Sequence, residues 1–215
     1  MNLALTVHLF FLLSLLLPAL LVVTERKKFK PNYRPFGFFI LTSFIIELVK
    51  FMLPELADAI RLNAGVQNLM EALFLCSIGK AWGFFGDGKK SYYMVMAMLL
   101  LLWILLNFIV PYPGWFTVLY SVATVLMAIQ LLIREILTTR EPLSRNTIFL
   151  ACMAFIIGYS FSGLLAIFMS TGQYSNPVIL EKTYLLSMSI VILTNIIYLK
   201  SVVCIPRKIA FLSPW

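Results

Sequence analysis

The sequence predicts an all-α polytopic membrane protein, a bundle of seven transmembrane helices. Hydrophobic residues make up 61% of the 215 residues and charged residues only 12%, whereas about 25% of the residues in a soluble domain are charged. The mean hydropathy is +0.96. Several apolar stretches reach the roughly 20 residues that a helix needs to cross a bilayer. We therefore expect a single transmembrane domain over residues 1–215, with no separate catalytic or nucleic-acid-binding domain.

The first two spans follow from the apolar runs at the start of the sequence. Residues 3–23 form a run longer than the core of about 7–15 residues in a signal peptide, and neither a basic region nor an A-x-A cleavage site flanks it. We therefore expect an uncleaved first span. The basic connection TERKKFKPNYRP ends it, and the second span is expected at 36–53.

The other spans are apolar runs between segments rich in charge, proline or glycine. PELADAIRLNAG precedes the third span, GDGKKS and PYPG flank the fourth, and REILTTREPLSR and TGQYSNPVILEK flank the sixth. The five spans are expected at 66–85, 92–110, 115–133, 146–170 and 183–205.

Small residues at four-residue spacing predict where these helices pack, because small side chains let two helices approach closely. We interpret both such rows as packing seams within one bundle, with homodimerisation as the alternative. They are Ala154, Gly158, Ser162 and Ala166 in the sixth span, and Gly79 and Gly83 at the end of the third.

Basic residues predict the orientation, because short loops rich in lysine and arginine face the cytoplasm. Only Lys50, Arg61 and Lys182 fall on one side of the predicted bundle. The N-terminus is therefore expected outside and the C-terminus in the cytoplasm, in the cell inner (cytoplasmic) membrane. The residues on the cytoplasmic side are Arg26, Lys27, Lys28, Lys30, Arg34, Lys80, Lys89, Lys90, Arg134, Arg140, Arg145, Lys200, Arg207 and Lys208.

The net charge of +8 does not predict nucleic-acid binding, since these basic residues lie in separate loops rather than on one continuous face. We expect them to set the topology and to contact anionic head groups of membrane lipid. An acidic or phosphorylated protein partner is the alternative.

Polar side chains inside the spans indicate a candidate site. Glu47 and Lys50 are three residues apart on one helix face and can form an ion pair. At 1.5 Å per residue, Glu47 lies about 9 Å below the outer boundary, and Glu71 and His8 about 7 Å. Because these depths are similar, we expect an outward-facing intramembrane pocket. Its predicted ligand-binding residues are Glu47, Lys50, Asn68, Glu71, His8 and Asn107.

Two interpretations of these residues remain open. In the first, Glu47 with Lys50 and Glu71 with Asn68 are internal polar contacts that fix the helix register. In the second, they line a pocket for a small polar or amphiphilic ligand, with Lys50 recognising an anionic group or the two glutamates a cation. Asn195 is expected to bond a neighbouring helix.

Several chemistries lack the residues that they need. A retinal protein requires a lysine in the middle of the seventh helix, whereas Lys200 lies near its cytoplasmic end. A zinc hydrolase needs several nitrogen and oxygen ligands, and the chain has one histidine. GYSFSG does not match the GxSxG pattern of a serine hydrolase. We therefore expect a protein that is not an enzyme and has no cofactor or metal.

Four segments, YRPFGFFILTSFIIELVKF, QNLMEALF, FIIGYSFSG and NIIYLKSVVCIPRK, resemble small seven-helix inner-membrane proteins of Bacteroidota. In that group a glutamate on helix two, an Asn-x-x-Glu on helix three and an aromatic-rich helix six recur. The resemblance implies the same topology and points to Glu47, Asn68, Glu71, Tyr159 and Asn195 as the matching positions, without implying an activity.

We expect a receptor-like or sensory component that binds its ligand from the outer side. Its predicted cytoplasmic loops have no more than about a dozen residues, so a signal would pass to a separate membrane or cytoplasmic protein partner. A small-solute transporter is one alternative, because the arrangement of three, one and three helices resembles the sugar-permease (SWEET) plan, although a PQ motif is absent. A structural subunit of a larger membrane complex is another.

Overall fold

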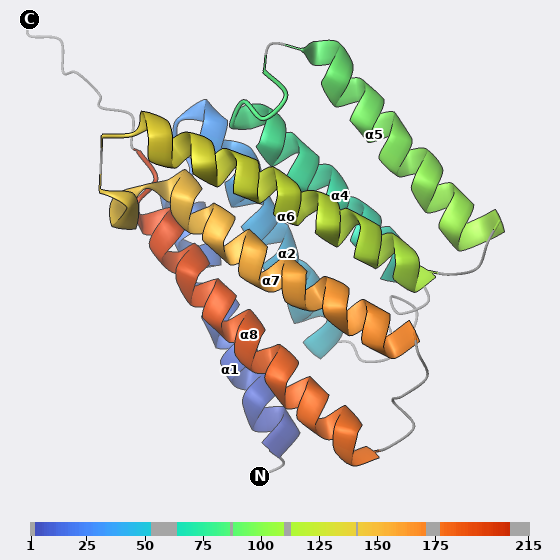
Figure 1. The fold of residues 1–215 in the computed structure, drawn as a ribbon. Helices are drawn as coiled ribbons and strands as arrows, with labels where there is room; N and C mark the ends of the chain where they lie inside the picture. The colour runs from blue at the N-terminus through green and yellow to red at the C-terminus, as the bar shows by residue number, and fades with distance from the viewer. Residues whose placement is uncertain are drawn as a thin grey trace, which may run out of the picture.

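The computed structural model describes residues 3–52, 64–86, 88–109, 113–140, 142–170 and 177–206. These residues form seven long helices and no strand, which confirms the all-helical class (Figure 1). Two short 3-10 helices, Pro31–Tyr33 and Leu143–Arg145, lie in connections. The long helices are α1 Leu3–Glu25, α2 Arg34–Met52, α4 Ala64–Ala81, α5 Lys89–Ile104 with a π-helical extension Leu105–Ile109, α6 Pro113–Thr138, α7 Thr147–Ser170 and α8 Pro177–Val203.

Six of these helices are long and apolar enough to cross a membrane, so the chain is a multi-pass helical membrane protein. Within the described residues α4 is the exception, because its 18 residues include two amides, a glutamate and a lysine. One face of α4 is nevertheless buried in the bundle, with Ala72, Leu75 and Ile78 no more than 3% exposed. The helix least suited to lipid, α4, therefore contacts protein along the face that carries Ala72, Leu75 and Ile78.

The helices pack mainly with their neighbours along the chain, and α1 closes the bundle by packing against α8 (Figure 1). The most extensive contact is between α6 and α7. By contrast, α5 lies at the edge of the bundle, where it packs on α4 and has no buried residue. The helix α5 thus contributes little to the core.

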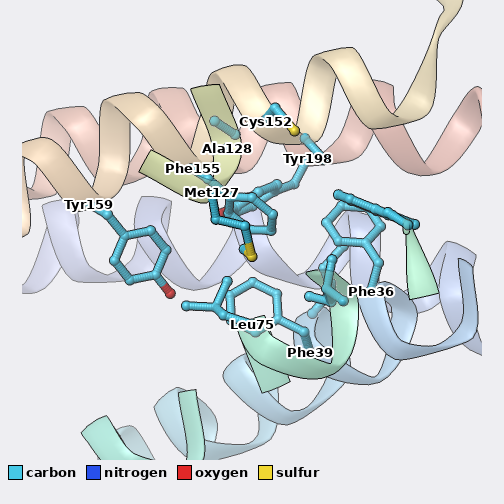
Figure 2. Close-up of a cluster of buried hydrophobic side chains, with 14 of the residues drawn as sticks. Phe36, Phe39, Leu75, Met127, Ala128, Cys152, Phe155, Tyr159 and Tyr198 are labelled. Atoms are coloured by element: carbon cyan, nitrogen blue, oxygen red, sulfur yellow. The ribbon is translucent and has the colours of Figure 1, made fainter. Parts of the chain in front are cut away.

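An aromatic cluster forms the centre of the core (Figure 2). Phe36 and Phe39 of α2 meet Phe155 of α7 and Tyr198 of α8, with ring centroids 5.8–6.2 Å apart. All five of these pairs pack edge to face, at interplanar angles between 61° and 86°. Such pairs contribute about 0.5–1.5 kcal/mol each beyond their buried area. The cluster therefore joins three helices that also surround the candidate site.

The predicted small-residue seams coincide with helix contacts at two positions. A Cβ atom on Gly158 of α7 would lie 3.4 Å from Cγ2 of Thr194 on α8. A Cβ atom on Gly79 of α4 would lie only 2.6 Å from Sδ of Met127 on α6. Both glycines allow the close approach for which the spacing was interpreted.

Gly83 has a role in ending α4 that the spacing alone did not suggest. Its φ angle is +76°, a left-handed conformation that glycine adopts easily. Its N–H donates to the carbonyl of Lys80, and the N–H of Phe84 donates to the carbonyl of Gly79, over 3.1 and 2.8 Å. This is the Schellman pattern that ends a helix. Gly83 therefore terminates α4, and a Cβ atom on it would also lie 3.1 Å from Nη1 of Arg134 on α6, a close approach between the two segments.

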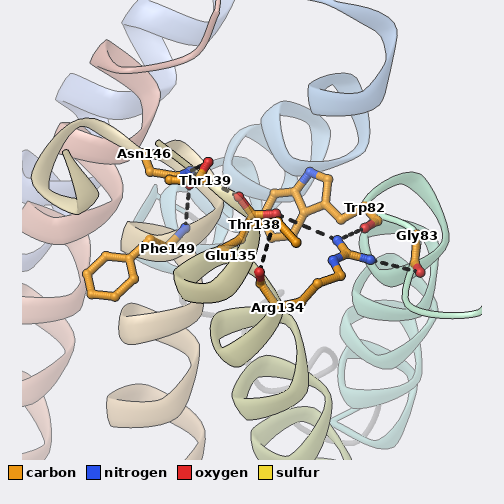
Figure 3. A network of polar contacts seen from close by, with 8 residues as sticks. All are labelled: Trp82, Gly83, Arg134, Glu135, Thr138, Thr139, Asn146 and Phe149. Atoms are coloured by element: carbon orange, nitrogen blue, oxygen red, sulfur yellow. Dashed lines mark hydrogen bonds and ion pairs between the residues drawn. The ribbon is translucent and has the colours of Figure 1, made fainter. Parts of the chain in front are cut away.

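Arg134 of α6 stabilises the same helix end (Figure 3). Its guanidinium donates to the carbonyls of Trp82 and Gly83, the latter over 3.0 Å. A cation beside the last carbonyls of a helix also interacts favourably with the helix dipole. Nearby, Asn146 caps α7 by accepting the N–H of Phe149 over 2.9 Å and donates to Glu135 over 3.0 Å. Side-chain contacts thus join three helix ends at this side of the molecule.

Candidate functional site

Five helices, α1, α2, α4, α7 and α8, surround a cavity of about 190 Å³. Glu47 of α2 and Glu71 of α4 both line it. The two glutamates that the sequence singled out therefore share one recess, although they come from different helices. Aromatic side chains from four helices form much of the remaining wall: Phe11, Phe39, Tyr159 and Tyr198.

Glu71 is held by donors from three helices. Its Oε2 accepts hydrogen bonds from the hydroxyls of Tyr120 on α6 and Tyr159 on α7, over 3.2 and 3.5 Å. Its Oε1 accepts from the side-chain amide of Gln67, one turn earlier on α4, over 3.4 Å. Among the residues that the structure describes, no lysine or arginine forms an ion pair with Glu71. Its carboxylate is thus oriented by neutral donors and has no cationic partner there.

Glu47 differs because it has a cation on its own helix. The Nζ atom of Lys50 lies 2.7 Å from Oε1 of Glu47, as the three-residue spacing predicted. The side chain of Glu47 is 20% exposed and that of Lys50 is 27% exposed, so neither is fully buried. Glu47 lines the cavity, whereas Lys50 is not part of the lining. The cavity wall therefore carries two carboxylates and no basic side chain among the described residues.

The other predicted site residues lie away from the cavity lining. Asn68 donates to the hydroxyl of Thr117 on α6 over 2.8 Å instead of pairing with Glu71. The ring of His8 stacks on Phe51 at a centroid distance of 5.5 Å.

The side chain of Asn107 also forms its hydrogen bond outside the cavity. Its side-chain amide donates to the carbonyl of Trp103, one turn earlier in its own helix, over 2.9 Å. Trp103 in turn donates to the carbonyl of Gly65 on α4 over 2.6 Å. The hydrogen bond from Trp103 joins the peripheral helix α5 to α4. The sequence reasoning included Asn107 in the site without information on the direction in which its side chain leaves its helix.

Several lining residues were not among the predicted ligand-binding residues. Gln67 is four residues before Glu71, which on a helix places both on one face, so this spacing could have identified it. Tyr159 was singled out only through the resemblance, and Asn195 was expected to bond a neighbouring helix rather than a ligand. Asn195 is 2% exposed and donates to the hydroxyl of Ser14 on α1 over 2.9 Å, in agreement with the expected bond to a neighbouring helix.

Two hydroxyl residues of the wall, Ser43 and Thr194, carried no sequence signal. The hydroxyls of Ser43 and Thr194 donate to carbonyls of their own helices, Phe39 and Val191, over 2.9 and 2.8 Å. Their hydrogens are used locally, and serines and threonines in apolar helices commonly bond in this way. The groups left to meet a ligand are mainly carboxylate oxygens, tyrosine rings and apolar surface.

This arrangement suits a small positively charged group. Carboxylates accept hydrogen bonds and attract cations, and the faces of aromatic rings attract cations as well. The cavity volume of about 190 Å³ is below the roughly 300–1,000 Å³ of pockets that hold drug-sized ligands, so the cavity suits a small ligand. Neither a protein-family model, nor a curated protein, nor a solved structure matches the chain.

Proposed function

We propose that this protein is a receptor-like component of the cell inner membrane that binds a small organic cation, such as a protonated amine, in the cavity beside Glu71. The observation that carries the proposal is a carboxylate inside a helical bundle that is held by three neutral donors and has no cationic partner among the described residues. Ionisable groups placed within membrane helices commonly mark ligand or ion sites.

The cavity wall favours a cation over an anion. Lys50, the residue that would recognise an anionic group, is paired with Glu47 and lies outside the lining. The wall instead combines two carboxylates with Phe39, Tyr159 and other aromatic rings. An ammonium group could pair with Glu71 while its carbon atoms contact the rings.

The proposed orientation places the N-terminus outside and the C-terminus in the cytoplasm. The connections between α1 and α2, α4 and α5, and α6 and α7 lie at one end of the bundle, together with the end of α8 (Figure 1). Lysines and arginines are concentrated in these connections, as on the cytoplasmic side of membrane proteins. Because the connections are short, a signal would require a separate protein partner.

Transport of the same class of ligand is the second candidate. The cavity lies between α1, α2 and α4 on one side and α7 and α8 on the other, whereas the lone fourth helix, α5, lies at the edge. Transporters built from three-helix repeats bind substrate between the two groups. Uptake of radiolabelled ethanolamine into proteoliposomes would favour transport, and binding without uptake would favour the receptor.

Calorimetry on the purified, detergent-solubilised protein tests the binding. Ethanolamine and choline serve as cationic probes, and ethylene glycol serves as the neutral counterpart of ethanolamine. The proposal expects heat from at least one cation and none from ethylene glycol. Glu71→Gln, which removes the charge and keeps the shape, should weaken binding at least about tenfold, the equivalent of roughly 1.4 kcal/mol.

Glu181→Gln is the matched control, because Glu181 is an exposed glutamate of α8 outside the cavity lining. It should leave the affinity unchanged. Equal affinity of the Glu71→Gln variant and the original protein for the cations, or equal binding of ethylene glycol, would exclude the proposed recognition.

A further inference from the structure

A second cavity, of about 300 Å³, lies where α1 ends and α2 begins. Most of its wall is apolar and comes from both helices, including Val22, Val23, Phe38 and Leu41. Val23 and Phe38 are 46% and 54% exposed, so the cavity is a groove on the outer surface of the bundle. In a membrane, this surface faces lipid.

Three cationic side chains line the same groove: Arg26, Lys27 and Arg34. All three are exposed, and none forms an ion pair within the described ranges. The one acidic residue of the segment 25–34, Glu25, lies 3.1 Å from Lys28 instead. The groove thus joins an apolar wall to three cations that lack a counter-ion in the described structure.

The polar and apolar parts of the groove follow one another along the helix axes. Arg26 and Lys27 directly follow α1, and Arg34 is the first residue of α2. Leu41 lies seven residues further along α2, about 10 Å away at 1.5 Å per residue. Gly37 lies between Arg34 and Leu41 on α2. A Cβ atom on Gly37 would be 3.2 Å from Cγ1 of Val22 on α1, so the two helices are in close contact at the floor of the groove.

We infer that this groove binds an anionic phospholipid. Arg26, Lys27 and Arg34 contact the phosphate, and an acyl chain lies against Val23, Phe38 and Leu41. Guanidinium groups match phosphate oxygens with two parallel hydrogen bonds, and basic clusters at the ends of membrane helices recognise anionic head groups. A free phosphate would leave the apolar wall unused, and a zwitterionic lipid would carry no net charge for the three cations. This site is separate from the cavity at Glu71 and does not depend on the function proposed for it.

Native mass spectrometry of the whole protein, extracted in a mild detergent, tests the inference. The protein is titrated with phosphatidylglycerol, with phosphatidylcholine of the same acyl chains, and with inorganic phosphate as competitor. Phosphatidylglycerol should bind at least about tenfold more tightly than phosphatidylcholine, since each basic residue near a membrane surface contributes about a factor of five. Inorganic phosphate at equal concentration should not displace it, because the acyl chain remains in the groove.

Two triple variants separate this site from the general positive charge of the protein. Arg26→Gln with Lys27→Gln and Arg34→Gln should lower phosphatidylglycerol affinity at least about tenfold. Lys89→Gln with Lys90→Gln and Arg140→Gln removes three exposed cations from the same end of the bundle and should lower it less than about twofold.

Equal losses in the two triple variants would show a diffuse surface charge and overturn the inference. Equal affinity for the two lipids would overturn it as well. Because the triple variants have fewer basic residues and can insert less well into the membrane, a further variant keeps all the charges. Val23→Trp, which fills the apolar part of the groove, should also weaken phosphatidylglycerol binding, and unchanged binding by this variant would exclude the placement of the acyl chain.

Discussion

The hydroxyl of Tyr120 on α6 donates a hydrogen bond to Oε2 of Glu71 on α4 over 3.2 Å, between residues 49 positions apart in the sequence. Tyr120 is only 4% exposed, so this bond forms inside the bundle. Together with Gln67 and Tyr159, it directs a carboxylate into the cavity between the helices. The same contacts that join α4 to its neighbours thereby orient the proposed ligand-binding group.

Tyr120→Phe removes this hydrogen bond and keeps the buried ring. We expect a loss of stability of about 0.6 kcal/mol, the average for hydrogen bonds between membrane helices, and of no more than about 1.7 kcal/mol. Reversible unfolding in mixed detergent micelles with increasing dodecyl sulfate measures the difference. Tyr93→Phe is the control, since Tyr93 is 61% exposed on the peripheral helix α5. If both variants unfold at the same detergent fraction, the bond to Glu71 does not stabilise the fold.

Ser162→Leu places a larger side chain at the wall of the cavity, where Ser162 lies on α7. Because the cavity is small, we expect it to abolish ethanolamine binding while the helix still forms, as leucine is a good helix former. Ser160→Leu is the control, because Ser160 is exposed on the same helix and is not part of this cavity wall. Calorimetry on both variants checks the prediction, and undiminished binding by the Ser162 variant would place the ligand elsewhere.

The sequence predicted the parts of this structure that depend on local composition and helix geometry. Seven helices follow from seven apolar runs, and the Glu47–Lys50 ion pair follows from a three-residue spacing on one helix. The partners of Glu71 could not be derived in this way, because Tyr120 and Tyr159 come from other helices.

The direction of each side chain around its helix was the missing information. His8 and Glu71 were expected at the same depth, yet His8 stacks on Phe51 and only Glu71 lines the cavity. Depth follows from counting residues along a helix, whereas the direction depends on how each helix is rotated against its neighbours. That rotation depends on packing contacts such as the one between Gly79 and Met127.

Gly79→Leu tests this packing contact. Even a Cβ atom at residue 79 would lie 2.6 Å from Sδ of Met127, so the larger side chain must displace Met127 or separate α4 from α6. We expect a destabilisation of about 1–3 kcal/mol, as for other overpacked cores. Adding Met127→Ala should recover part of it, because the shorter side chain leaves space. Strictly additive effects of the two substitutions, measured by the same unfolding assay, would contradict direct contact between these residues.

Arg134→Gln removes the cation that binds the carbonyls at the end of α4. These acceptors then lose a charged donor, and the helix dipole loses a favourable charge, so we expect a loss of stability of about 1–3 kcal/mol. Arg134→Lys keeps the charge, but its ammonium lacks the planar fork of donors and should restore only part of the loss. Arg140→Gln removes an exposed arginine from the same region and should change stability by less than about 0.5 kcal/mol. Hydrogen exchange of residues 79–84 locates the effect: faster exchange there in the Arg134 variants alone would assign it to the end of α4, whereas equal exchange in all three variants would show that the Schellman motif holds this end without the arginine.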